Sequence, residues 1–121
     1  MALMQTLTLK QARIEFSLAI AELILYAHSI QYDLALAEGM DRRTEKDPTS
    51  DHMKGSLHDI GLAQDLDLYI DGVYQTTPES HARLGEWWKQ YGSEHGLRLA
   101  WGGDFTTKDA NHYSLSWGGK S

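Results

Sequence analysis

The sequence contains no cysteine, which excludes a disulfide framework, a thiolate metal site and a cysteine nucleophile. A metal site would therefore need histidine, aspartate or glutamate ligands, and the chain has 6 histidines. Basic residues are also few: 11 lysines and arginines stand against 17 acidic residues, which gives a net charge of −6. Because nucleic-acid phosphates attract a basic surface, we predict that nucleic acid is not a partner.

A long hydrophobic run is missing as well. The most apolar segment, residues 18–27, resembles the core of a signal peptide but is too short to span a bilayer. Glu15 and Glu22 lie in or beside this segment, and no clear small-residue cleavage site follows it. We therefore interpret it as part of a buried helix. We expect a protein with no signal peptide and no stable membrane insertion, synthesised in the cytoplasm.

The length and composition indicate an ordinary globular protein. The chain has 121 residues, 41% of them hydrophobic and 23% charged, which is enough for one domain with a real core. No internal repeat is visible. We expect a single domain over residues 1–121 and, by default, a monomer.

Two segments carry helix signals. Thr8 and Gln11 match a capping box, and an apolar stripe follows to about Ser29. Thr77-Pro78-Glu79 is a second helix start, and Gly96 is a natural stop. The apolar stripe of the first helix contains Phe16, Ile20, Leu23, Ile24 and Ala27. That of the second contains Leu84, Trp87, Trp88 and Tyr91, while His81 and His95 are expected to be exposed or partly packed.

Strand signals occupy most of the remaining chain. Residues 64–70 alternate between polar and apolar side chains, as in a half-buried strand, and residues 112–117 alternate in the same way. We expect further strands at 33–38, 73–76 and 97–101, a polar loop at 39–55 and a frayed tail at 118–121. This order of elements predicts an α+β fold, with helices packed on one face of a small, mostly antiparallel sheet.

Two short stretches carry the residues that could perform chemistry. His58 and Asp65 lie seven positions apart (65 − 58 = 7), with Gly61 allowing a turn between them, and His112 lies near the other end of the chain. Two imidazoles and one carboxylate can hold a zinc ion and leave a fourth position open for water. Asp109 would then lie close to the metal without binding it, which makes it the candidate general base.

The spacing by itself leaves a simpler interpretation open. Histidine and aspartate occur at many separations in proteins without forming a site, and no general ligand-spacing rule covers this pattern. In that interpretation His58 and His112 would only form hydrogen bonds or lie at the surface.

The motifs have a further implication. Ser-x-His-x-x-Gly-x-Ala-x-Asp at 56–65, followed by Trp-Gly-Gly-Asp-Phe at 101–105 and Asp-x-x-His at 109–112, resembles the zinc peptidases of the D-alanyl-D-alanine carboxypeptidase and L-alanyl-D-glutamate endopeptidase family. Many members are phage endolysins. The resemblance covers about residues 34–117 and implies one catalytic peptidase domain. It implies that His58, Asp65 and His112 bind Zn²⁺ and that Asp109 is the catalytic acid and base.

The resemblance also implies an arginine before the first motif, which helps to bind or polarise the peptide. Arg43, followed by Thr44, fits that role best, and Arg42 is the near alternative. A guanidinium suits a carboxylate or a developing oxyanion, although an ordinary solvated role for this pair stays open. Ser56 could form hydrogen bonds to the substrate near the site.

Together these features predict a zinc-dependent peptidase that hydrolyses peptidoglycan stem peptides. The most specific hypothesis is an L-alanyl-D-glutamate endopeptidase that serves as a phage or prophage endolysin. It would be made in a bacterial host and reach the cell wall by a holin-type route. One alternative is a D-alanyl-D-alanine carboxypeptidase or dipeptidase on the same scaffold. Another is a non-catalytic zinc-binding module, which the presence of Asp109 disfavours.

Overall fold

The computed structural model describes residues 6–37 and 56–121. The two predicted helices and the five predicted strands are all present. The ends of the strands differ by one or two residues from those expected. The elements are α1 (Leu9–Ser29), β1 (Tyr32–Leu36), β2 (Ala63–Ile70), β3 (Val73–Gln75), α3 (Pro78–His95), β4 (Leu99–Trp101), the 3₁₀ turn η1 (Gly102–Asp104) and β5 (His112–Leu115).

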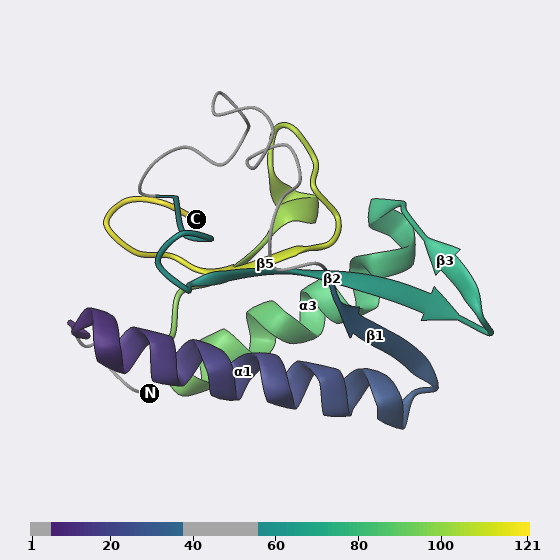
Figure 1. The fold of residues 1–121 in the computed structure, drawn as a ribbon, viewed down its shortest axis with the longest axis horizontal. Helices are drawn as coiled ribbons and strands as arrows, with labels where there is room; N and C mark the ends of the chain where they lie inside the picture. The colour runs from purple at the N-terminus through teal and green to yellow at the C-terminus, as the bar shows by residue number, and fades with distance from the viewer. Residues whose placement is uncertain (1–5, 38–55) are drawn as a thin grey trace.

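The strands form one antiparallel sheet with the order β1-β2-β5-β4 (Figure 1). Strand β2 is the longest and organises the others: one of its edges pairs with β1. Its other edge pairs with β5 over 63–65 and with β3 over 68–70. The predicted α+β architecture with an antiparallel sheet is therefore confirmed.

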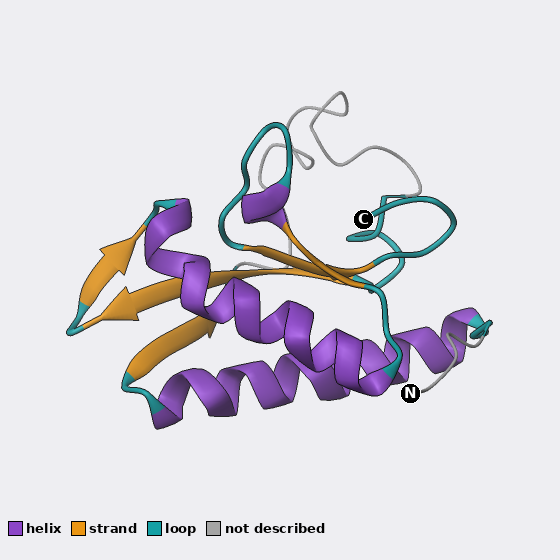
Figure 2. Ribbon diagram, turned by 180° about the vertical axis from the view of Figure 1, so that it is seen from behind, coloured by secondary structure: helices purple, strands orange, loops and turns teal. Residues whose placement is uncertain are grey.

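Both helices pack on the same face of this sheet, whereas the loops 56–62, 105–111 and 116–121 lie on the opposite side (Figure 1, Figure 2). The indole of Trp88 is fully buried between the helices and the sheet. Its ring meets Phe16 of α1 and Tyr113 of β5 edge-on, at centroid distances of 6.0 and 5.7 Å. Trp88 thus links α1, α3 and the sheet in one hydrophobic core. The other face of the sheet, on the loop side, is available for a site.

The helix ends follow the local signals in the sequence. The side chain of Thr8 accepts a hydrogen bond from the amide of Gln11, and the Gln11 side chain accepts one from the amide of Thr8. Thr77 caps α3 in a similar way by accepting from the amide of Ser80. Gly96 ends α3 in the left-handed conformation, with φ of 69°, which a residue with a Cβ adopts at a cost.

Strand β5 differs from its prediction. The alternation from 112 to 117 indicated one exposed face, but β5 ends at Leu115 and all four of its residues are buried. The reason is its place between β2 and β4, with helices on one face and loops on the other. The tail also differs, because it is not frayed: Trp117 and Lys120 exchange backbone hydrogen bonds of 2.9 Å across a turn at Gly118 and Gly119.

His81 was expected to be exposed or partly packed, and this prediction was wrong. Its side chain is 1% exposed and its Nδ1 lies 3.0 Å from the hydroxyl of Tyr113. Burial lowers the pKa of His81 from its usual 6.5. A hydrogen bond with the backbone of Gln75 and the charge of Asp67 act in the opposite direction. The folded protein therefore favours the neutral imidazole.

This burial predicts an acid-sensitive component of stability. A lowered pKa means that the unfolded chain binds more protons below pH 6.5, so the contribution of His81 is present above that pH and is lost as the pH falls. Comparing urea unfolding at about pH 7.5 and about pH 5.5, we expect His81→Gln to lose less stability on acidification than wild type. His28→Gln, at an exposed position of α1, is the control. Equal losses in all three proteins would contradict the assignment.

Candidate metal centre

The three predicted metal ligands, His58, Asp65 and His112, come together on the loop side of the sheet. Asp65 of β2 lies directly opposite His112 of β5 in the antiparallel register. His58 is carried by the loop that leads into β2. Within the described parts of the chain, these residues form a group of histidine and acidic side chains that could hold a metal ion.

The distances within this group suit a small divalent cation. Asp65 Oδ1 lies 3.6 Å from His58 Nε2 and 3.7 Å from His112 Nδ1, and the three ligand atoms all lie within 4.8 Å of one another. Tetrahedral zinc with bonds of about 2.1 Å would place its ligand atoms about 3.4 Å apart. Asp65 Oδ1 is also buried and has no hydrogen-bond donor among the described residues. The residues present therefore fit a zinc ion.

The loop that carries His58 is closed by its own backbone. The amide of Asp59 donates to the carbonyl of Ser56 at 3.0 Å, and the amide of Leu62 donates to that of Leu57 at 2.8 Å. Gly61 has φ of 77°, so the turn predicted from the glycine is present. Ser56, predicted to contact the substrate, lines the pocket at this site. Its Oγ also accepts a 3.4 Å hydrogen bond from the amide of Asp59.

A second loop, between η1 and β5, carries Asp109. The carbonyl of Gly102 accepts from the amides of Phe105 and Asp109, at 3.1 and 2.9 Å, and the amide of His112 donates to the carbonyl of Asp109 at 3.0 Å. The Asp109 carboxylate is half exposed, with Oδ2 3.9 Å from His112 Nδ1. The structure thus places the predicted base beside the predicted ligands, on the side open to solvent.

The group lines a pocket of about 640 Å³. Sequence reasoning did not assign several of its residues: Phe105, Thr107, Lys108, Asn111 and Ser121. The ring of Phe105 lies 5.3 Å from that of His112 between centroids and covers one side of the imidazole. Phe105, Thr107 and Lys108 precede the Asp109 to His112 motif and Asn111 lies inside it, so these four could have been suspected from their position. Ser121 reaches the pocket only through the turn of the tail.

The arginines assigned by resemblance are not placed. Arg42 and Arg43 fall in the segment 38–55, outside the described residues, so their roles stay predictions. Among the described residues that line the pocket, Lys108 supplies the cationic side chain, and its Nζ donates to the carbonyl of Gly103 at 3.1 Å.

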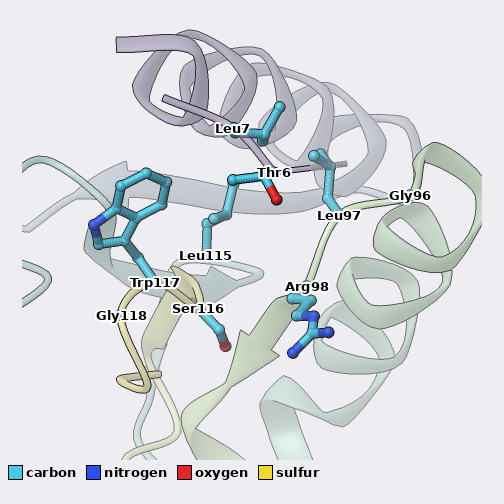
Figure 3. Close-up of a pocket in the computed structure, with 9 residues that line it drawn as sticks. All are labelled: Thr6, Leu7, Gly96, Leu97, Arg98, Leu115, Ser116, Trp117 and Gly118. Atoms are coloured by element: carbon cyan, nitrogen blue, oxygen red, sulfur yellow. The ribbon is translucent and has the colours of Figure 1, made fainter. Parts of the chain in front are cut away.

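Another hollow, of about 450 Å³, lies at the opposite end of β5 (Figure 3). Leu7, Leu97 and Leu115 contribute aliphatic side chains to its lining, and Trp117 and Arg98 lie on either side in the view. Among the described residues that line it there is no histidine and no acidic residue. It therefore offers no ligands for a metal, and the group around Asp65 is the better candidate for catalysis.

Comparison with known proteins agrees with this geometry. The profile of the D-alanyl-D-alanine carboxypeptidase family matches residues 49–115, which is more than half of the chain. The chain belongs to this family and is a peptidase. No curated protein sequence matches it significantly.

The fold itself is shared with a solved structure. The L-Ala D-Glu endopeptidase ChiX of Serratia marcescens superposes with a TM-score of 0.68 at 23% sequence identity. The match covers 89% of this chain and 83% of that one. The family resemblance drawn from the motifs is thereby confirmed, and at this level of identity the likeness to ChiX shows a common fold.

The geometry predicts one metal ion per chain. In a competition titration with zinc or cobalt, we expect His58→Ala, Asp65→Ala and His112→Ala each to weaken binding by more than about 100-fold. That figure is the upper range for removing only a supporting partner of a ligand. His28→Ala, which removes an exposed histidine on α1, should leave the affinity unchanged. Wild-type affinity in any of the three ligand variants would remove that residue from the set.

Proposed function

We propose that this protein is a zinc-dependent peptidase that hydrolyses the stem peptides of bacterial peptidoglycan, with His58, Asp65 and His112 as the metal ligands. The observation that carries the proposal is the convergence of these three side chains at ligand distances, with the Asp109 carboxylate 3.9 Å from one of them. Membership of a peptidase family supports the same reaction.

The arrangement divides the chemistry between the metal and the chain. A zinc ion held by this group would polarise the scissile carbonyl and make a water molecule more acidic. Asp109 takes the proton from the attacking water as the new C–O bond forms. It then gives that proton to the leaving amine as the C–N bond breaks. Because the Asp109 carboxylate is half exposed, both the attacking water and the leaving amine can reach it in the open pocket.

The pocket suits a substrate that carries carboxylates. The described lining residues include the acids Asp65 and Asp109, which would repel an anionic peptide without a compensating charge. A bound metal ion would supply part of that charge, and Lys108, which lines the pocket, supplies more. Arg43, or Arg42, is our candidate for the second cation. Stem peptides are acidic, so this balance of charge is appropriate for them.

Among the bonds of the stem peptide, we propose that the chain cuts between L-alanine and D-glutamate, as an endopeptidase. The fold shared with an L-Ala D-Glu endopeptidase supports this choice. The family description supports the alternative, a D-alanyl-D-alanine carboxypeptidase. An endolysin role, with release from the cytoplasm of a phage-infected or prophage-carrying host, is the biological setting that we propose. No described helix is long and apolar enough to cross a membrane.

Digestion of purified peptidoglycan tests the reaction. With zinc-loaded wild type, we expect turbidity to fall and mass spectrometry to find fragments with a new N-terminal D-glutamate. Asp109→Asn should retain zinc but lose at least about 100-fold in kcat, because a positioned proton-transfer group contributes that much. A chelated wild-type sample should be inactive.

Different products would lead to different conclusions. Release of D-alanine alone would show that the carboxypeptidase alternative is correct. A folded, zinc-loaded wild type that cleaves neither bond would refute the proposed function and favour a non-catalytic zinc-binding module. An Asp109→Asn variant with full activity would remove Asp109 from the mechanism.

A further inference from the structure

The indole of Trp101 packs between two glycines, whose lack of side chains leaves room for the ring. Trp101 ends β4 and is 5% exposed. Its ring lies against the backbone of Gly85 in α3 and of Gly103 in η1, and a Cβ at either glycine would overlap the ring. Lys89 of α3 lies 5.7 Å from the ring centroid, and its Nζ also binds the Asp104 carboxylate at 2.8 Å. Helix and loop therefore hold the indole in one orientation.

That orientation directs the indole N–H at the loop between η1 and β5, which carries Asp109. Trp101 Nε1 donates a 2.7 Å hydrogen bond to the carbonyl of Ala110. Ala110 is buried and lies inside the turn from Asp109 to His112. This turn is closed by a hydrogen bond from the amide of His112 to the carbonyl of Asp109. The indole hydrogen bond thus fixes the peptide plane between the proposed base and the third proposed ligand. The backbone of Gly102 also lies close against this turn, because a Cβ there would overlap the carbonyl oxygen of Asp109.

His112 needs such support from its backbone. A histidine that binds a metal through one ring nitrogen usually donates the other N–H to a carboxylate or a carbonyl, which orients the ring. In His112, Nδ1 faces Asp65, and the buried Nε2 has no hydrogen-bond partner among residues 6–37 and 56–121. The orientation of the ring then depends on the Asp109 to His112 turn and on packing against Phe105.

From these contacts we infer that Trp101 is a positioning residue for the site: its indole N–H, held between Gly85 and Gly103, orients both Asp109 and His112 through Ala110. The inference deepens the proposed function and rests on it for the readouts of activity and zinc affinity. Through its hydrogen bond Trp101 contacts Ala110, and neither Asp109 nor His112 directly, so it is not itself a catalytic residue.

The chain offers a matched control. Trp88 is also buried, and its Nε1 also donates to main-chain carbonyls, those of Ala100 at 2.9 Å and Ser114 at 3.3 Å. Neither carbonyl belongs to the 109–112 turn. Trp101→Phe and Trp88→Phe therefore remove the same indole N–H from two buried positions, one in β4 and one in α3, and both variants should lower the thermal midpoint.

The two variants should differ in function. For Trp101→Phe we expect kcat to fall about 10-fold with KM nearly unchanged, and the zinc dissociation constant to rise about 10-fold, the low end for loss of ligand support. Trp88→Phe should leave kcat and zinc affinity close to wild type. Equal changes in the two variants, or none in Trp101→Phe, would refute the positioning role and leave Trp101 as an ordinary core residue.

Two further measurements keep the test decisive. Gly85→Ala pushes on the indole from α3 while keeping its N–H, and should reproduce the loss of kcat if Trp101→Phe does not fold. Amide NMR shifts of Asn111 and His112 in the metal-free protein should move in Trp101→Phe and not in Trp88→Phe. This readout needs neither metal nor activity, so an inactive wild type would refute the proposed function without deciding the role of Trp101. Unmoved amides would overturn that role.

Discussion

The pairing of Asp65 with His112 across β2 and β5 is the constraint on which the site depends. Directly opposed residues of an antiparallel pair point to the same face of the sheet, so this register brings a carboxylate and an imidazole together. A slip of one residue would turn one of them to the helix side. The opposite face of β5 belongs to the hydrophobic core, where Tyr113 is fully buried beneath the helices. Stability and chemistry are thus assigned to opposite faces of one strand pair.

The remaining parts of the site are delivered by two tight loops that rise on the loop side of the sheet. One carries His58 and closes through backbone hydrogen bonds around Gly61; the other carries Asp109 and closes on the carbonyl of Gly102. Both loops require a glycine. Gly61 has a positive φ, and at Gly102 a Cβ would overlap the carbonyl oxygen of Asp109. Short loops on a rigid sheet can hold catalytic side chains to a fraction of an ångström, which proton transfer between fixed groups demands.

Local signals predicted well, and properties that depend on neighbours did not. The capping box at Thr8 and the stop at Gly96 were found from sequence because a helix end satisfies its hydrogen bonds with adjacent residues. The burial of both faces of β5 was missed, since alternation cannot show that a loop layer covers the polar face. The burial of His81 was missed for a related reason: its partner Tyr113 is 32 residues away. The tail turn that brings Ser121 to the pocket was missed as well.

The sequence by itself determined the inventory of the site and the class of protein. Without cysteine, a metal centre had to use histidine and carboxylate ligands, and the motifs at 56–65, 101–105 and 109–112, in that order, identified the peptidase family. Only the tertiary structure decided which nitrogen of His112 faces Asp65, how near Asp109 lies and what holds that turn in place. The physical reason is one of range. A motif records which side chains are present, whereas their relative orientation depends on strand register, loop closure and packing, which join residues distant in the chain.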